Sequence, residues 1–133
     1  MNNTQCKIQM LDLYFSKYSF NQVRGKEDTD YTTSFKIEYA INSSDTTKVK
    51  VTIDTTVANS SETIKLDLQA VGIFQIDNND IDEETYDHLI KTNTVAIIFP
   101  FIRSQVSLLT TQPNMKPIII PPINIDILIS EQN

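Results

Sequence analysis

The chain has 133 residues, of which 40% are hydrophobic, and this is enough for one domain with a modest core, which we expect to cover residues 1–133. The formal net charge of −6 argues against nucleic-acid binding, because neutralising phosphates takes a surplus of Lys and Arg. The two glycines, Gly25 and Gly72, are too few for the loops that cradle nucleotide phosphates.

The N-terminal region carries no sign of export. The single cysteine, Cys6, has no second cysteine with which to form a disulfide. Lys7, Asp12 and Lys17 interrupt the stretch in which a signal peptide needs a continuous apolar segment. Apolar runs elsewhere fall far short of the ~20 residues that span a bilayer. We therefore expect a cytoplasmic protein without a membrane span.

Alternating apolar and polar residues predict strands near residues 35–41, 49–53 and 64–76. In the last of these, Gly72 permits a bulge or the close approach of another element. Nearer the N-terminus the apolar parity changes between Met10 and Leu11, which predicts a strand with a bulge or bend. We expect four antiparallel strands in a meander-like order, with an exposed loop over residues 22–30.

Six carboxylates gather between residues 77 and 87. A calcium loop is disfavoured, because Ile81 stands where an oxygen ligand is needed and Asp82 replaces the turn glycine. Acidic residues in a first helical turn are instead stabilised by the helix dipole. We therefore expect a helix capped by Asn79 or Asp80.

Residues 94–111 carry apolar side chains every three or four positions, which predicts a long helix in spite of several β-branched residues. We expect a kink at Pro100, which has no N–H to donate to the carbonyl of residue 96. Ala96, Phe101 and Leu108 form a second apolar stripe, which a monomer would expose. A proline-rich extended segment over residues 115–123 and a short final element follow.

No combination of nucleophile, base and acid stands out. His88 is the single histidine, and Cys6 has no neighbouring Arg or His to activate its thiol. A histidine without cysteine or histidine partners is seldom a metal ligand. We expect no cofactor, no metal and no catalysis, and a hydrolase that uses the carboxylates of residues 77–87 is the weakest alternative.

Three motifs occur in order along the chain: Gly72-Ile73-Phe74, Phe99-Pro100-Phe101-Ile102-Arg103 and Pro122-x-Asn124-x-Asp126-x-Leu128. In these motifs and their spacing, over roughly residues 6–128, the sequence resembles the SecB family of export chaperones, which hold unfolded polypeptides. The resemblance implies an α+β fold in which a four-stranded antiparallel sheet packs against a long helix. It also implies a homo-oligomer, either a dimer or a tetramer.

Two polar residues of these motifs have structural interpretations. An unpaired Arg103 within an apolar helix would be costly, and Asp126 in the third motif is its candidate partner. Asn124 is expected to bond nearby backbone groups in preference to a ligand.

The resemblance implies an ATP-independent holdase with a long apolar groove for extended clients. Aromatic rings supply large, non-directional contact area, and the candidate lining residues are Phe20, Phe35, Phe74, Phe99 and Phe101. For each of them burial in the core is the alternative. The alternative to general export is a dedicated adaptor for one client, such as an antitoxin or a phage-encoded protein.

Two further surfaces follow from the resemblance. Leu66, Leu68 and Ala70 match positions at the contact between SecB dimers, so we expect them in an oligomer interface. Asp67 matches a glutamate that docks the basic, zinc-bearing tail of the SecA motor, but Lys65 and Lys17 stand where the family has an apolar residue and an acid. These two positive charges would repel a basic tail, which makes SecA an uncertain partner.

Overall fold

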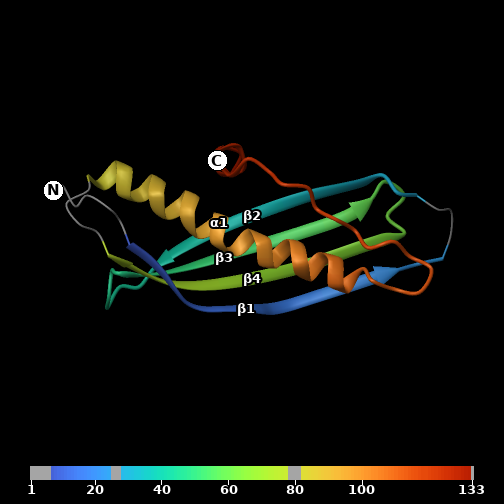
Figure 1. Ribbon diagram of the computed structural model, residues 1–133, viewed down its shortest axis with the longest axis horizontal. Helices are drawn as coiled ribbons and strands as arrows, with labels where there is room; N and C mark the ends of the chain where they lie inside the picture. The colour runs from blue at the N-terminus through green and yellow to red at the C-terminus, as the bar shows by residue number, and fades with distance from the viewer. Residues whose placement is uncertain (1–6, 25–27, 78–81, 133) are drawn as a thin grey trace.

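The computed structural model of the protein describes residues 7–24, 28–77 and 82–132. This part of the chain forms four strands and two helices. Their bounds are β1 Lys7–Gln22, β2 Tyr31–Ile41, β3 Lys48–Asn59, β4 Ile64–Asp77, α1 Glu83–Leu109 and α2 Ile125–Ser130. The fold is α+β, as the sequence predicts, with the strands in one antiparallel sheet (Figure 1).

The strand order in the sheet is β1-β4-β3-β2. Strands β2, β3 and β4 form a meander, but the expectation of a meander was wrong for β1, which crosses over and pairs with β4 from Lys7↔Asp77 to Gln22↔Ile64. As a central strand, β4 has a neighbouring strand on each edge, and it is buried on both faces at Ala70 and Val71. Alternation in the sequence does not identify which strands flank it.

Strand β1 is irregular in two places. Its pairing with β4 shifts between Met10 and Asp12, which confirms the predicted bulge, and shifts again between Phe15 and Lys17, which the sequence did not indicate. Each shift exchanges the two faces of the strand, because side chains alternate with a period of two.

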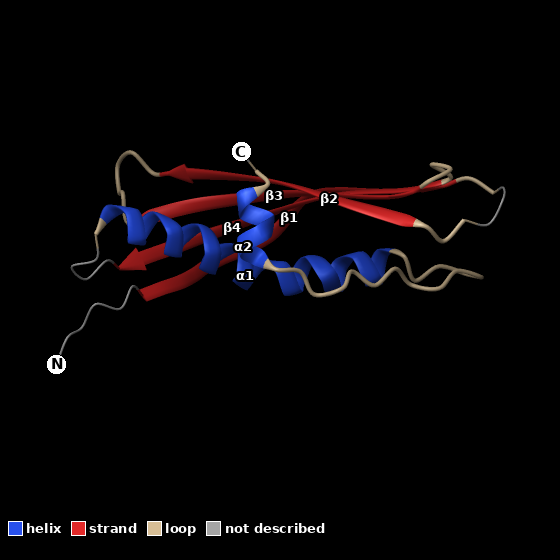
Figure 2. Cartoon of the chain, turned by 90° about the horizontal axis from the view of Figure 1, so that it is seen from above, coloured by secondary structure: helices blue, strands red, loops and turns tan. Residues whose placement is uncertain are grey.

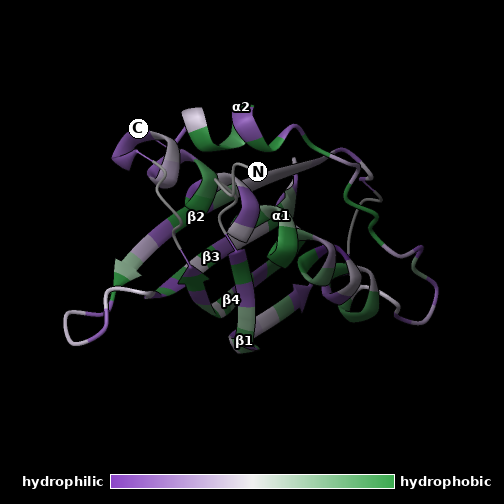
Figure 3. Ribbon diagram, turned by 60° about the vertical axis from the view of Figure 1, so that its left-hand side comes forward, coloured by the Kyte–Doolittle hydropathy of each residue, from purple (hydrophilic) through white to green (hydrophobic). Residues whose placement is uncertain are grey.

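One face of the sheet is covered by α1, which crosses it obliquely, while neither of the described helices lies on the other face (Figures 1 and 2). Alternate residues of β3 and β4 point into the covered face, and Figure 3 shows the resulting change between hydrophobic and hydrophilic residues along the strands. Val51, Val57 and Phe74 of these strands are fully buried. Burying each such side chain stabilises the fold by about 1.5–3 kcal/mol.

Gly72 lies where α1 comes closest to β4. A Cβ atom at this position would stand 2.7 Å from Phe74 Cε2 and 2.8 Å from Ile98 Cδ1. The predicted close approach is therefore confirmed. Gly72 is not at a bulge, since its pairing with Leu13 and Val51 continues without a shift of register.

Helix α1 is a single helix of 27 residues, longer than the stretch that the period of the sequence predicts. Its N-cap is Asp82, whose carboxylate accepts a hydrogen bond from Thr85 N at 3.1 Å. The helix thus begins later than a cap at Asn79 or Asp80 would place it, and those two residues lie outside the described part of the chain. Pro100 lies inside α1, and a kink there stays a prediction.

After α1 the chain runs back along the helix as an extended segment (Figure 1). The backbone of this segment forms hydrogen bonds with three side chains, two from α1 and one from the C-cap residue of the helix. Arg103 Nε donates to Ile120 O at 2.8 Å and Ser107 Oγ donates to Ile118 O at 3.1 Å. Thr110 Oγ1 accepts from Ile118 N at 2.8 Å. The side chains of Ile118 and Ile120 are also buried. We call residues 118–120 the anchored segment, because both these hydrogen bonds and this burial hold it against α1.

The predicted pair of Arg103 and Asp126 is wrong. The guanidinium group bonds a backbone carbonyl of the anchored segment, and the carboxylate of Asp126 lies 3.8 Å from His88 Nε2 at an exposed site. A carbonyl in the proline-rich segment thus takes the place of a charged partner. Asn124 bonds the backbone, as expected, and does so as the N-cap of α2, accepting from Ile127 N at 3.2 Å.

Candidate functional site

The structure does not bring the five candidate phenylalanines into one groove. Phe35 and Phe99 meet in an edge-to-face pair with ring centroids 5.4 Å apart, at the junction of β2 and α1. Phe74 is fully buried beneath α1, and Phe101 is exposed on the opposite side of that helix from Phe99. Phe20, on β1, is half-buried. Phe74 therefore belongs to the core, because it faces the same layer as Ile98.

The outer face of α1 and the segment that follows the helix expose large apolar side chains. Phe101, Leu108 and Ile119 are 46%, 67% and 73% exposed. The predicted exposure of a second stripe, which includes Ala96, is confirmed for this chain taken alone. Between this stripe and the anchored segment lies an open groove of about 660 Å³, with Pro100 and Arg103 among its lining residues.

The expected oligomer row is not available for contact with a second chain. Leu66, Leu68 and Ala70 lie on the covered face of β4 and are 0%, 3% and 0% exposed, so the structure contradicts their use as a free surface. Helix α1 covers this row, because it is one long helix and packs against β4.

A second groove, of about 910 Å³, opens where the loop after β1, the turn before β4 and the segment after α1 meet. Arg24, Tyr31 and Met115 are among its lining residues. One wall is fixed by Asp28, whose carboxylate accepts bonds from Ser60 Oγ at 2.6 Å and Ser61 N at 2.8 Å. These hydrogen bonds, the Ser60 hydroxyl first, lower the pKa of Asp28 to about 2.

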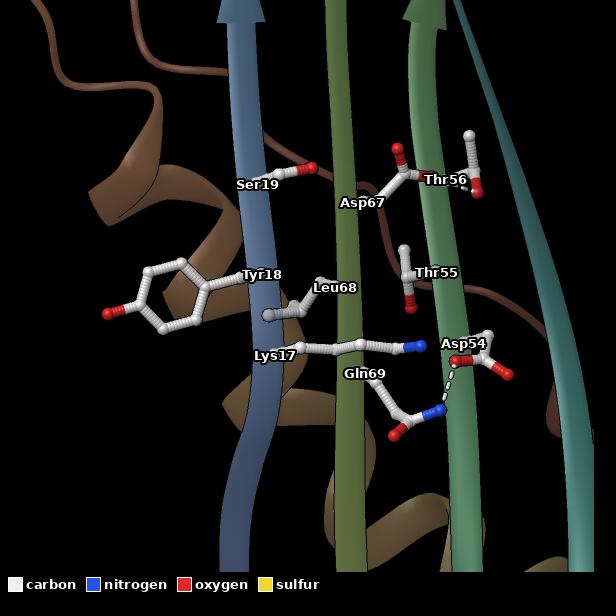
Figure 4. A pocket seen from close by; sticks show the side chains of 9 residues that line it. All are labelled: Lys17, Tyr18, Ser19, Asp54, Thr55, Thr56, Asp67, Leu68 and Gln69. Carbon is white, nitrogen blue, oxygen red and sulfur yellow. Dashed lines mark hydrogen bonds between the residues drawn. The ribbon is translucent and has the colours of Figure 1, made fainter.

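The open face of the sheet carries the residues of the predicted SecA position. Lys17 pairs with Gln69, and Lys65 and Asp67 lie on the same face of β4, so the expected arrangement of two lysines around one carboxylate is present. Figure 4 shows the Lys17 side chain extending across β4 toward β3. A shallow pocket of about 420 Å³ lies here.

A hydrogen-bonded network ties three strands together on this face. Ser16 Oγ donates to Gln69 Oε1 at 2.6 Å. Gln69 Nε2 in turn donates to Asp54 Oδ1 at 2.8 Å, the bond that Figure 4 draws as a dashed line. Thr56 Oγ1 donates to Asp67 Oδ1 at 2.9 Å, which fixes one oxygen of that carboxylate. Ser16 is the extra residue of the second β1 bulge, which explains why the sequence pattern did not reveal this network.

The polar residues of the described chain do not form a catalytic set. His88 contacts only Asp126 in an ion pair, at 3.8 Å, and both side chains are exposed. Three of the six acids that invited a hydrolase or calcium hypothesis, Asp82, Glu83 and Glu84, form the cap and first turn of α1. Asp77 ends β4, Asp87 pairs with Lys91 at 3.0 Å, and Asp80 lies outside the described residues. Within residues 7–24, 28–77 and 82–132 no group of three or more His, Cys, Asp or Glu residues is placed to hold a metal. Neither described helix is long and apolar enough to cross a membrane.

The fold is that of a SecB-like chaperone. It matches the SecB-like chaperone of Mycobacterium tuberculosis, solved in complex with a peptide from the HigA1 antitoxin, with a TM-score of 0.72, 17% identity and coverage of 88% of each chain. A protein of unknown function from Streptococcus agalactiae matches with a TM-score of 0.52 and 9% identity, over 89% of this chain and 99% of that one.

The family model for SecB, the preprotein translocase subunit, matches residues 1–133, and the chain therefore belongs to the SecB family. It is 30% identical over 86 residues to the protein-export protein SecB of Methylobacillus flagellatus, covering 64% of this chain and 54% of that protein. It is also 30% identical over 79 residues to an uncharacterized protein of Methanocaldococcus jannaschii, covering 59% of this chain and 50% of that protein. The chain spans about half the length of the curated relatives that it matches. SecB-like chaperones are not enzymes.

Proposed function

We propose that this protein is an ATP-independent holdase, a single cytoplasmic domain that binds extended, non-native polypeptides without a cofactor. The observation that carries the proposal is the match of the SecB family model over the whole chain. The structure supports it with open grooves of about 910 and 660 Å³ beside exposed apolar side chains. Exposed apolar surface of this kind favours binding of many unrelated sequences, because its contacts are non-directional.

The holdase proposal is tested by the aggregation of a chemically unfolded client, such as citrate synthase diluted from guanidinium chloride. We expect suppression near stoichiometric amounts without nucleotide, because burying client apolar surface gives ~25 cal/mol per Å² before ordering costs. Lysozyme in its native form is the control, and it should not bind. If a several-fold excess leaves aggregation unchanged, the general holdase is excluded.

A dedicated adaptor for one client is the second candidate function. It is favoured by the fold match to a chaperone that was solved with a peptide from an antitoxin. Mass spectrometry of polypeptides that copurify from the native host distinguishes the two functions. A single dominant partner at stoichiometric amounts supports the adaptor, and a broad mixture of precursors supports the general holdase.

The outer face of α1 is our candidate for an oligomer interface in place of the buried β4 row. Leu108 and Phe101 lie on one side of the helix, away from the sheet, and together form an apolar stripe whose burial between subunits would be favourable. Light scattering should give a dimer or tetramer at micromolar concentration. Leu108→Glu should reduce the mass to that of a monomer, whereas Lys36→Glu, at an exposed site on the opposite face of the sheet, should leave it unchanged.

SecA remains an uncertain partner. Lys17 and Lys65 flank Asp67 on the open face, and same-face side chains on neighbouring strands lie close enough for their charges to interact. We expect the basic tail of SecA to bind weakly or not at all in calorimetry. Lys17→Asp with Lys65→Leu should strengthen binding in a salt-dependent manner. Tight binding by the wild type that these changes do not affect would favour export coupling.

A further inference from the structure

Strand β2 is an edge strand, and one side chain occupies its free edge. Ile37 N donates to Gln132 Oε1 at 2.9 Å, and Gln132 Nε2 donates to Phe35 O at 3.0 Å. Gln132 follows the C-cap of α2, which brings it from the opposite end of the described chain to the middle of β2.

The group that occupies the edge has the chemistry of a peptide bond. A carboxamide offers one acceptor and two donor hydrogens, and here it satisfies a backbone N–H and a backbone C=O on either side of Lys36. In a β-ladder, an added strand would bond these same two groups through its own backbone. The Gln132 side chain therefore takes the position of a short piece of a fifth strand.

The side chains beside this edge suit an extended apolar segment. Phe35, Ile37 and Tyr39 pair with Thr55, Ile53 and Val51 of β3, all buried on the covered face, so all three point toward the α1 layer. Because backbone groups alternate in direction along a strand, the N–H and C=O of Tyr39 point out of the edge as those of Ile37 do. A segment added here would place alternate apolar side chains next to the pair of Phe35 and Phe99.

The contact that holds Gln132 in place is slight. Helix α2 has six residues, of which Leu128 alone is buried, and its link to α1 includes the exposed pair of His88 and Asp126 at 3.8 Å. Exposed pairs of this kind stabilise little. The Gln132 side chain is half-buried, so a segment with several backbone groups can compete with it for the edge.

We propose that Gln132 is a displaceable plug on the β2 edge, and that the edge beneath it is a strand-addition site for an extended polypeptide segment. This inference rests on the proposed holdase function and assigns one of its binding surfaces. The polypeptide adds its backbone to Phe35, Ile37 and Tyr39 once the carboxamide leaves. Strand edges are commonly protected against such pairing, and here a side-chain amide protects the edge reversibly.

The plug itself is tested without any client, by hydrogen exchange of the Ile37 amide in NMR. Gln132→Ala removes the acceptor and should speed exchange by about tenfold or more, in proportion to the lost protection. Glu131→Ala changes an exposed neighbour and should leave the rate unchanged. Equal exchange in the wild type and in Gln132→Ala would overturn the plug.

Strand addition is tested with two synthetic ten-residue peptides that alternate Leu and Ser, of which one carries an N-methyl group on every residue, so that neither of its edges can donate hydrogen bonds. Gln132→Ala should bind the plain peptide about threefold to tenfold more tightly than the wild type does, because a competing group has been removed. Gln132→Glu should do the same, since a carboxylate cannot donate to Phe35 O. The N-methylated peptide, which cannot complete the ladder, should show no gain.

The outcomes separate this inference from the proposed function. If the wild type binds neither the peptides nor the unfolded client, the holdase itself fails. If it binds them and the Gln132 variants bind both peptides with unchanged affinity, only the strand-addition site fails. If Gln132→Ala instead forms concentration-dependent dimers in light scattering and gains no peptide affinity, the occupant of the edge is a second copy of the chain, and the inference is overturned.

Discussion

In the anchored segment and at the β2 edge, backbone groups that no neighbouring strand pairs with are bonded by side chains instead. In both places side chains bond the backbone of an extended stretch that has no neighbouring strand there: Arg103, Ser107 and Thr110 bond residues 118–120, and Gln132 bonds β2. The anchored segment also buries Ile118 and Ile120, whereas the Gln132 side chain stays half-buried. Because burial of Ile118 and Ile120 adds to the hydrogen bonds of the anchored segment, we expect this contact to be the more stable of the two.

The largest expected effect is at Thr110. Thr110→Val keeps the shape of the side chain but leaves the buried N–H of Ile118 without its acceptor. We expect a loss of about 2–3 kcal/mol in the free energy of unfolding, because an unsatisfied buried donor keeps its full desolvation penalty. Urea denaturation measures it, with Thr111→Val at the adjacent exposed site as the control. Equal losses in both variants would mean that the anchor contributes nothing specific.

Arg103 should have the next effect. Arg103→Met preserves the apolar stem and removes the charged donor to Ile120 O, and we expect a loss of about 1–2 kcal/mol. Lys116→Met, which changes an exposed cation of the same region, is the matched control for net charge. If added salt abolishes the difference in stability between Arg103→Met and Lys116→Met, a long-range charge effect and not the bond to Ile120 O is responsible.

Gln132→Ala should cost less than about 1 kcal/mol in urea denaturation, because the two bonds that it removes leave groups on an edge that water reaches. The contrast between this small loss in the free energy of unfolding and the larger loss in Thr110→Val tests the comparison of the two regions most directly. A loss as large as that of Thr110→Val would show that α2 is a fixed part of the core and cannot be displaced.

The smallest effect concerns Asp28 and pH. Its pKa is lowered from 3.8 to about 2 in the folded chain, chiefly by the Ser60 hydroxyl and then by the backbone N–H groups of Asp30 and Ser61. A lowered carboxyl pKa contributes stability that is present above the unfolded value and is lost as the pH falls from about 4 toward 2. Asp28→Asn should reduce the fall in urea midpoint across this window, and Asp12→Asn, at an exposed site on β1, should not.

Much of the fold was predictable because it depends on local periodicity. The alternation in β2, β3 and β4 and the three-to-four repeat in α1 predicted the type and order of these elements, although β2, β3 and α1 each extend further than their patterns indicate. The pairing of β1 with β4 was not predictable, because antiparallel hairpins are the default between neighbouring strands and nothing in β1 names its partner. The cap of α1 was misplaced because several acids in a row each suit that position.

The candidate site was less predictable than the fold. Aromatic character does not separate Phe74, in the core, from Phe101, on the surface, since large apolar residues occupy both places. The partner of Arg103 was wrong because a backbone carbonyl satisfies a guanidinium group as a carboxylate does. The roles of Ser107, Thr110 and Gln132 left no sequence signal, because each depends on two segments that meet only in the folded chain.

The order of the strands also has a consequence for synthesis. Of the four described strands, β1 is synthesised before the others, yet its pairing partner β4 is synthesised after them. The hairpin of β2 and β3 is complete earlier, because Ile41 and Val49 are joined by a short turn. Until β4 emerges, β1 is a long strand whose apolar side chains have no neighbouring strand beside them, and contacts so distant in sequence form slowly. During synthesis this protein therefore passes through an extended, unpaired state of the kind that the proposed holdase would bind.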